Sequence, residues 1–222
     1  MPARPNARSH ARKPPPATLV LFVRHGQTPT TGTTLPGRAA GLHLADSGRT
    51  QAAAAATRLA LLKRIDAIYA SPLERTRETA APIGRARKLA VRIDRGLLEC
   101  DFGDWTGRKL NDLRKLPEWN AVQRYPSGFR FPSGESFTEM QTRMVTTVDK
   151  LVTRHSGGVV VAVSHADPIK AAVAHAMGVH LDLFQRVVIS PCSISAIMYS
   201  LSGAVVLSVN STGDDLSSLA PS

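Results

Sequence analysis

The sequence predicts an α/β fold, a three-layer α/β/α sandwich with a mainly parallel central sheet. The apolar runs over residues 18–23 and 159–163 are short and rich in β-branched side chains, as buried strands are. Segments long enough to form helices separate such runs along the chain. Strands that alternate with helices favour a parallel sheet with helices on both faces.

The length and composition are those of one folded domain. The chain has 222 residues, of which 43% are hydrophobic, and this is enough to bury a sizeable core. We expect a single domain over residues 18–211. The Pro-, Arg- and Ala-rich residues 1–17 are expected to form a disordered basic tail, and residues 212–222 a loose C-terminal tail.

The first half of the chain supplies two strands, two helices and a long loop. Asp46 or Ser47 can cap the helix that contains the alanine run, and Pro72 suits the first turn of the next helix. In chain order we expect a strand over 18–23, a loop over 26–43, a helix over 46–63, a strand over 66–70 and a helix over 73–86.

The second half adds the remaining strands and the most clearly amphipathic helix. Apolar residues recur at helical spacing between residues 137 and 151, and residues 201–203 join two β-rich runs as a hairpin. In chain order we expect a strand over 89–93, a mixed helical excursion over 108–134, a helix over 135–155, a strand over 159–163, a helix over 167–177, and strands over 193–200 and 204–209.

The chain is strongly basic, with a formal net charge of +11. Residues 1–17 hold four basic residues and no acid, so +7 remains on the rest of the chain. Positive charge around a cleft draws in anionic substrates. The chain has no basic stripe interleaved with aromatic residues and no helix-turn-helix or zinc-finger spacing, so we expect no specific nucleic-acid partner.

The sequence offers no feature of a membrane or secreted protein. No apolar stretch is long enough to span a bilayer, and the basic N-terminus lacks the apolar segment of a signal peptide. We therefore expect a cytoplasmic protein without a membrane partner. Cys100 and Cys192 form no metal-binding or disulfide pattern, which favours two unpaired thiols in a reducing compartment.

Arg24, His25 and Gly26 stand where the first strand ends. Ligands of open α/β sheets bind at the carboxyl edge of the strands. Arg24 offers a planar set of donors for phosphate oxygens, and the imidazole of His25 can carry a covalent group. Gly26 lets the backbone turn sharply beside an anion. These features together indicate phosphoryl chemistry.

Two further strand ends carry residues of the same kind. Arg75 lies in the first turn of the helix that follows the second strand, where backbone N–H groups also favour an anion. His165 follows the strand over 159–163 and opens a helix. We expect the two arginines and the two histidines to converge at one edge of the sheet.

A carboxylic acid near this cluster can donate the proton that a leaving alkoxide needs. Glu99 ends a strand-like run and enters a Gly-rich, aromatic loop that also holds Asp101 and Asp104. The residues alone leave these three carboxylates as competing candidates.

Taken together, these residues resemble the histidine phosphatase superfamily, whose fold is shared by cofactor-dependent phosphoglycerate mutases and many small phosphatases. The resemblance covers about residues 19–209, and Pro132-Ser-Gly-Glu-Ser136 before the long helix also fits. Four segments match in the family order: Leu-Phe-Val-Arg-His-Gly-Gln-Thr (21–28), Ser-Pro-Leu-Glu-Arg-Thr-Arg-Glu-Thr (71–79), Leu-Leu-Glu-Cys-Asp-Phe-Gly-Asp-Trp-Thr-Gly (97–107) and Val-Ser-His-Ala (163–166).

The resemblance implies a phosphoglycerate mutase-like fold and a role for each residue of the cluster. His25 resembles the nucleophile that becomes phosphohistidine, and Glu99 matches the proton donor. Arg24, Arg75 and His165 resemble the group that holds and neutralises the phosphoryl oxygens. Phosphoryl transfer needs positioning and charge stabilisation, which these groups supply, so the resemblance implies neither a metal nor a cofactor.

Three further residues are expected to bind substrate. The backbone amide of Ala166 adds a donor at the start of a helix. Family members often have Asn at the position of Thr31, and we expect the hydroxyls of Thr28 and Thr31 to hydrogen-bond the phosphate. The Thr-rich loop around them departs from the family pattern, so its other substrate contacts are not carried over.

The resemblance favours the phosphatase branch of the family. Its mutases are usually longer after the Glu motif and carry an Arg-rich element for bisphosphoglycerate, whereas Glu99 is followed by a short Phe-Gly-Asp-Trp-Thr-Gly segment. We expect a phosphomonoester hydrolase with a small phosphorylated substrate. A phosphoglycerate mutase-type phosphomutase, a non-catalytic phosphate-binding module and a metallophosphatase are the alternatives, and the natural substrate and the oligomeric state stay open.

Overall fold

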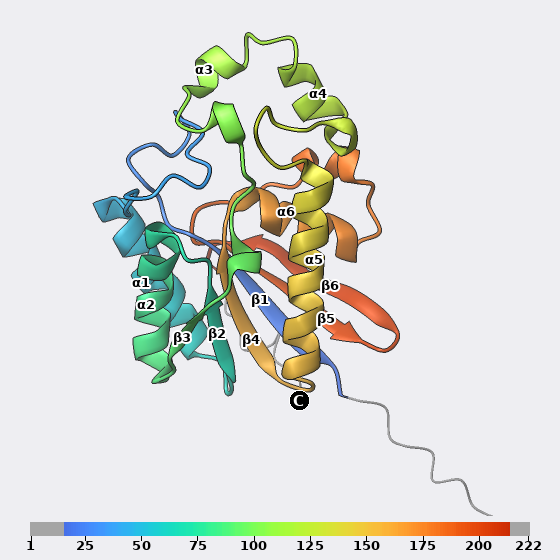
Figure 1. Cartoon of the computed structure of the whole chain (residues 1–222). Helices are drawn as coiled ribbons and strands as arrows, with labels where there is room; N and C mark the ends of the chain where they lie inside the picture. The colour runs from blue at the N-terminus through green and yellow to red at the C-terminus, as the bar shows by residue number, and fades with distance from the viewer. Residues whose placement is uncertain (1–15, 214–222) are drawn as a thin grey trace, which may run out of the picture.

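The computed structural model describes residues 16–213. It consists of a six-stranded sheet between two layers of helices, which is the predicted α/β/α sandwich (Figure 1). The tails predicted over 1–17 and 212–222 lie outside the described residues except for two residues each. The strands of the sheet come from the chain between residues 18 and 211.

The sheet is mainly parallel, as predicted. Its strands are β1 (Thr18–Arg24), β2 (Ala67–Ala70), β3 (Val91–Ile93), β4 (Val159–Ser164), β5 (Ile194–Ser200) and β6 (Gly203–Ser211). They lie in the order β3-β2-β4-β1-β5-β6. β4 pairs in parallel with β1 and β2, and β2 in parallel with β3, whereas β5 runs antiparallel to β1 and β6.

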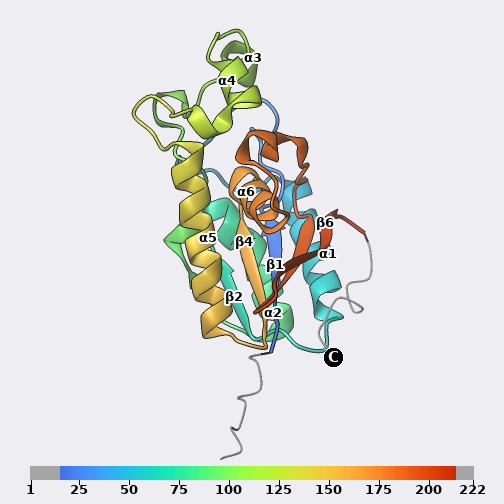
Figure 2. The ribbon, with the colours of Figure 1, turned by 90° about the vertical axis from the view of Figure 1, so that its right-hand side faces the viewer.

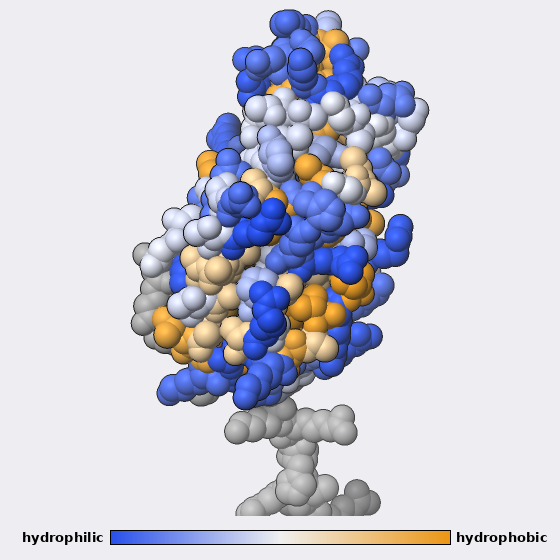
Figure 3. All heavy atoms as spheres, turned by 90° about the vertical axis from the view of Figure 1, so that its left-hand side faces the viewer, coloured by the Kyte–Doolittle hydropathy of each residue, from blue (hydrophilic) through white to orange (hydrophobic). Residues whose placement is uncertain are grey.

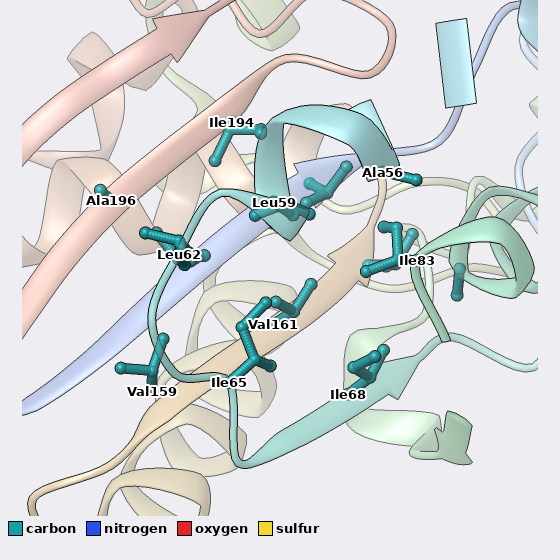
Figure 4. Close-up of a cluster of buried hydrophobic side chains, with 14 of the residues drawn as sticks. Ala56, Leu59, Leu62, Ile65, Ile68, Ile83, Val159, Val161, Ile194 and Ala196 are labelled. Atoms are coloured by element: carbon teal, nitrogen blue, oxygen red, sulfur yellow. The ribbon is translucent and has the colours of Figure 1, made fainter. Parts of the chain in front are cut away.

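Two apolar cores hold the helices on the sheet. The helices α1 (Asp46–Ala60) and α2 (Glu74–Arg87) cover one face, and α5 (Phe137–Arg154) and α6 (Ala166–Ala176) cover the other (Figure 2). Side chains alternate along a strand, so β1 is buried on both faces and contributes to both cores. Figure 4 shows the first core, where Leu59 of α1 and Ile83 of α2 lie over the sheet.

The predicted helical excursion lies beyond the carboxyl edge of the sheet. It contains the short helices α3 (Leu110–Leu113) and α4 (Trp119–Arg124), which stand above the strand ends in Figure 1. Aromatic rings form its core, including Trp105, Phe131 and Phe137. This core packs the excursion against the start of α5, beside the carboxyl ends of the strands.

Three local expectations are wrong. Ala45 precedes α1 without a side-chain cap, so neither Asp46 nor Ser47 caps it. The same helix ends at Ala60, three residues before Lys63, because the N–H groups of Leu61 and Leu62 bond to the carbonyl three residues back and not four. No strand leads to Glu99: a 3₁₀ turn (Arg95–Leu97) stands there instead, and the carbonyl oxygens of Gly96 and Leu98 accept from the side chain of Arg143 and not from a neighbouring strand.

The face that carries α1 and α2 is mostly hydrophilic, and its apolar side chains lie in small separate patches (Figure 3). Scattered exposed apolar residues are normal for a folded protein surface. Among residues 16–213, no helix has both the length and the apolar character needed to cross a membrane.

Candidate active site

The register of the sheet brings the two predicted histidines together. Arg24 at the end of β1 lies opposite Ser164 at the end of β4, so His25 and His165 follow adjacent strand ends. The centroids of their rings are 5.2 Å apart. Both strands run in parallel, which is why two residues distant in the sequence meet at one edge.

His25 is held in one tautomer and is uncharged. Its Nδ1 lies 2.8 Å from the carbonyl oxygen of Gly26, and a carbonyl only accepts, so Nδ1 carries the hydrogen and Nε2 keeps its lone pair. Burial, followed by the positive charges of Arg75 and Arg24, lowers the pKa of His25 well below its ordinary value of 6.5. A neutral imidazole with a free Nε2 is a nucleophile at neutral pH.

Arg75 is fully buried and Arg24 is half-buried, and both have spare donors. Arg24 donates from Nη1 to the carbonyl oxygen of Ile189 at 2.6 Å, and Arg75 from Nη2 to that of Gly37 at 2.7 Å. Among the described residues, Nε of both arginines and Nη1 of Arg75 have no partner. Burial lowers the pKa of each guanidinium. A buried donor without a partner is costly, and an anion bound here would satisfy it.

His165 is fully buried and is oriented by a residue that the sequence reasoning passed over. Its Nε2 lies 2.9 Å from Oγ of Ser71, while its Nδ1 has no partner in the described chain. Burial, and then the charge of Arg75, lowers the pKa of His165 well below 6.5. The sequence did place Ser71 directly after β2, and because β2 lies beside β4, this position could have predicted its contact with His165.

Glu99 is the carboxylate that the fold buries beside these groups. Burial, followed by the charge of Asp167, raises its pKa to about 7, against the opposing effect of Arg75 and Arg24. Its Oε1 accepts a hydrogen bond from the backbone N–H of Cys100 at 3.0 Å. A carboxyl group with this pKa keeps a proton to donate near neutral pH.

The structure separates the three competing carboxylates. Asp101 lies 3.3 Å from Nη1 of Arg38, with 41% of its side chain exposed, and Asp104 accepts from the hydroxyl of Ser133 on the surface. Of the three, Glu99 alone lines the pocket described next.

A pocket of about 370 Å³ joins most of the predicted residues. Its lining residues include Arg24, His25, Thr28, Thr31, Glu99 and Ala166. Arg75 and His165 do not line it: the charge of Arg75 contributes to the lowered pKa of His25, and the ring of His165 lies 5.2 Å from that of His25. Lys170 and Asp167 also line it, as an ion pair 3.3 Å apart that the sequence analysis did not single out.

The two threonines and Ala166 line the same pocket. The hydroxyls of Thr28 and Thr31 are 2.9 Å apart, and that of Thr31 also accepts from the backbone N–H of Thr28. Ala166 is the first residue of α6, where backbone N–H groups lack partners within the helix and favour an anion. These groups can therefore add donors around a phosphate.

No group of three or more His, Cys, Asp or Glu residues that could hold a metal ion exists between residues 16 and 213. Cys100 and Cys192 are both buried and form no disulfide. Burial raises the pKa of the Cys192 thiol to about 12. The Cys192 thiol is therefore not a thiolate at neutral pH.

The fold and the site define a class of protein. The sequence model of the histidine phosphatase superfamily (branch 1) matches residues 20–212. The chain therefore belongs to this superfamily, as the sequence analysis expects.

Individual relatives carry more specific names. The Bifunctional protein Rv2228c of Mycobacterium tuberculosis is 32% identical over 198 residues, which are 88% of this chain and 54% of that protein, so the chain spans about half its length. Phosphoserine phosphatase 1 of Hydrogenobacter thermophilus is 31% identical over 198 residues, 87% of this chain and 92% of that protein. The solved structure of mycobacterial glucosyl-3-phosphoglycerate phosphatase Rv2419c is similar with a TM-score of 0.79 and 26% identity, covering 88% of this chain and 99% of that one.

Proposed function

We propose that the protein hydrolyses phosphomonoesters through a phosphohistidine formed on His25. The observation that carries this proposal is the state of His25: its hydrogen bond to Gly26 leaves Nε2 free, and its lowered pKa leaves it uncharged. Arg24 and Glu99, which line the same pocket, provide a cation and a proton donor. The relatives named as phosphatases support the same reaction class.

The reaction takes two displacement steps. In the first, Nε2 of His25 attacks phosphorus, the bond to the ester oxygen breaks, and Glu99 gives its proton to the leaving alkoxide. In the second, the Glu99 carboxylate takes a proton from water, whose oxygen attacks the phosphohistidine. Inorganic phosphate leaves, and both side chains return to their starting states.

Fixed positive groups stabilise the transferring phosphoryl. Arg24 lines the pocket, whereas Arg75 and His165 lie buried beside His25, and we expect their unpartnered donor atoms to reach the phosphoryl oxygens over which the charge spreads. The backbone N–H of Ala166 and the hydroxyls of Thr28 and Thr31 complete the set. We assign no step to a metal or an organic cofactor, because these side chains supply the charge.

The substrate class that we propose is a small phosphorylated metabolite met in the cytoplasm. The names of the relatives point to phosphoserine and glucosyl-3-phosphoglycerate as first substrates to try. The strongly positive formal charge of +11 also suits an anionic substrate. The phosphomutase alternative differs only in the acceptor, since a mutase returns the phosphoryl to a hydroxyl instead of water.

The decisive experiment measures both the intermediate and its acceptor. Purified protein is quenched rapidly with ³²P-labelled substrate, and an acid-labile, base-stable phosphoprotein is expected from wild type and not from His25→Ala. Steady-state product analysis should give inorganic phosphate.

Three other outcomes would change the proposal. Formation of the phosphoprotein, followed by transfer to a second hydroxyl without release of phosphate, would indicate a phosphomutase and not a hydrolase. An His25→Ala variant that keeps most of its activity would overturn the covalent mechanism, and full activity lost to a chelator and restored by zinc would favour a metallophosphatase.

A further inference from the structure

The Pro132-Ser-Gly-Glu-Ser136 segment has no part in the chemistry above, yet its glutamate lies directly behind the proton donor. Glu135 Oε1 and Oε2 accept from Nε and Nη2 of Arg143 at 2.9 and 2.8 Å, which is the bidentate geometry of a strong ion pair. Oε2 also accepts from Nη2 of Arg38 at 2.9 Å. The Glu135 side chain is 14% exposed, so this network is shielded from solvent screening.

Arg143 uses all of its donors. Its Nη1 donates to the carbonyl oxygens of Gly96 and Leu98, both at 2.8 Å, and its Nη2 reaches that of Glu99 at 3.3 Å. With the two bonds to Glu135, the five N–H groups of the guanidinium are all engaged. Arg143 thus ties three carbonyls of the segment before and at Glu99 to α5.

Arg38 donates to the same carbonyl oxygen of Glu99. This bond comes from its Nε at 2.9 Å, and its Nη1 lies 3.3 Å from Asp101. The preceding residue, Gly37, accepts from Arg75 through its carbonyl oxygen. One dipeptide therefore contacts both the buried phosphate-binding guanidinium and the backbone of the proton donor.

These contacts replace the strand that the sequence predicts and the fold lacks. Residues 98–100 belong to no helix or strand, so no ladder of backbone hydrogen bonds fixes them. The close packing of Gly96 against α5 adds to the same anchor, since a Cβ at Gly96 would lie 1.8 Å from Oγ1 of Thr147.

We propose that Arg143, clamped by Glu135 and assisted by Arg38, is a positioning residue that sets where the Glu99 carboxyl lies in the pocket. The inference rests on the proposed phosphatase function, because it concerns the same proton donor. Arg143 touches no substrate and acts through the Glu99 backbone. Geometry of this kind is costly to lose: a displacement of about 1 Å can lower a rate by about 10²-fold.

The test compares two esters that differ in their need for a proton. Arg143→Gln and Glu135→Gln are assayed on an alkyl phosphate, whose alkoxide needs protonation, and on p-nitrophenyl phosphate, whose phenolate leaves without it. We expect kcat on the alkyl ester to fall by about 10- to 100-fold and kcat on the aryl ester to fall by less than about threefold. KM for both esters should change little, because the phosphate-binding groups are untouched.

Two further measurements separate positioning from general damage. In a Glu99→Gln background, Arg143→Gln should cost nothing more, because residues that act as a unit are not additive. The limb of the pH profile that reports Glu99 should move to lower pH in Arg143→Gln, since a released segment admits water to the carboxyl. Arg143→Lys should not restore the wild-type rate, because an ammonium cannot reproduce the planar fork.

Arg154→Gln is the matched control. It makes the same substitution on the same helix, at an exposed residue about 16 Å along the axis from Arg143, and should leave both esters unaffected. Equal losses on both esters in folded variants, or additive losses with Glu99→Gln, would overturn the positioning role while leaving the phosphatase proposal intact. Wild-type protein that hydrolyses neither ester would instead remove the proposed function itself. If Arg143→Gln does not fold, the milder Glu135→Gln decides on the same criteria.

Discussion

His25 and Glu99 lie in one pocket, yet their pKa values shift in opposite directions. Burial disfavours the charged form of each, which lowers the pKa of a histidine and raises that of a carboxylic acid. The result is a neutral base and a neutral acid at the same pH. Pairs of groups whose environments separate their pKa values in this way support the proposed roles of His25 as nucleophile and Glu99 as proton donor.

The first prediction is the pH dependence of hydrolysis of an alkyl phosphate. The rate should fall as pH rises through about 7, because Glu99 must be protonated to donate. It should fall on the acid side only well below pH 6.5, because His25 must be uncharged to attack. The measurement is kcat/KM against pH. Glu99→Gln should lose the upper limb and about 10²–10⁴ in kcat, and an upper limb that persists in this variant would assign it to another group.

The second prediction concerns the buried guanidinium. Arg75→Lys keeps the charge but loses the planar donors, including the two without a partner, so kcat/KM should fall by about 10²–10³. Competitive inhibition by inorganic phosphate should weaken in parallel. Arg77→Lys, an exposed position two residues along the same helix, serves as the control and should change neither. Equal behaviour of the two variants would remove Arg75 from phosphate binding.

At the scale of elements, the loop after β1 rests directly on the start of α1. A Cβ at Gly48 would lie 2.0 Å from the carbonyl oxygen of Gln27, and a Cβ at Gly26 would lie 2.5 Å from that of Gly48. The backbones therefore pack against each other without side chains between them. Since the carbonyl of Gly26 holds Nδ1 of His25, this contact also fixes the nucleophile.

The third prediction follows from that contact. Gly48→Ala should push residues 26–27 away from α1 and lower kcat by about 10- to 100-fold, with the phosphohistidine forming more slowly in rapid-quench measurements. Gly213→Ala is the control, because nothing lies within 4 Å of a Cβ there. A Gly48→Ala variant that forms the intermediate at the wild-type rate would show that the loop tolerates the displacement.

The sequence predicts well those elements that form because of a local pattern of apolar and polar side chains. Apolar strands with a polar residue at the end place His25 and His165 at one edge, because parallel strands bring their carboxyl ends together. The segment at Glu99 was predicted wrongly as strand-like. Its conformation depends on side chains of α5 more than 40 residues away, and no local pattern reveals such contacts. The residues alone also left Glu99 and Asp101 as competing candidates. The family resemblance favoured Glu99, and the structure distinguishes the two by their burial.

At the scale of the whole molecule, the described chain begins far from the site. A Cβ at Gly157, just before β4 begins, would lie 2.4 Å from Pro16, so the chain enters the sheet at the ends opposite His25 and His165. The fourth prediction is that deleting residues 1–15 changes hydrolysis of a small phosphate ester by less than about twofold, because exposed charges are largely screened beyond about 8 Å at physiological salt. A folded truncated protein that loses most of its activity would contradict this.

Burial of Glu99 also has a consequence for the folding equilibrium. Below pH 4.5, its ordinary pKa, the carboxyl is protonated in the folded and unfolded states alike. Between pH 4.5 and about 7 the folded protein keeps a proton that the unfolded chain releases, so the free energy of unfolding falls as pH rises. At about 1.36 kcal/mol for each pKa unit, the loss reaches up to about 3 kcal/mol above pH 7.

The fifth prediction is therefore that a much less active variant is the more stable protein. Glu99→Gln should melt at a higher temperature than wild type at pH 8 and at nearly the same temperature at pH 4, as followed by circular dichroism. A variant that melts lower than wild type at pH 8 would mean that the carboxylate stabilises the fold. The carboxyl group to which we assign proton donation is, at alkaline pH, a group that destabilises the folded protein.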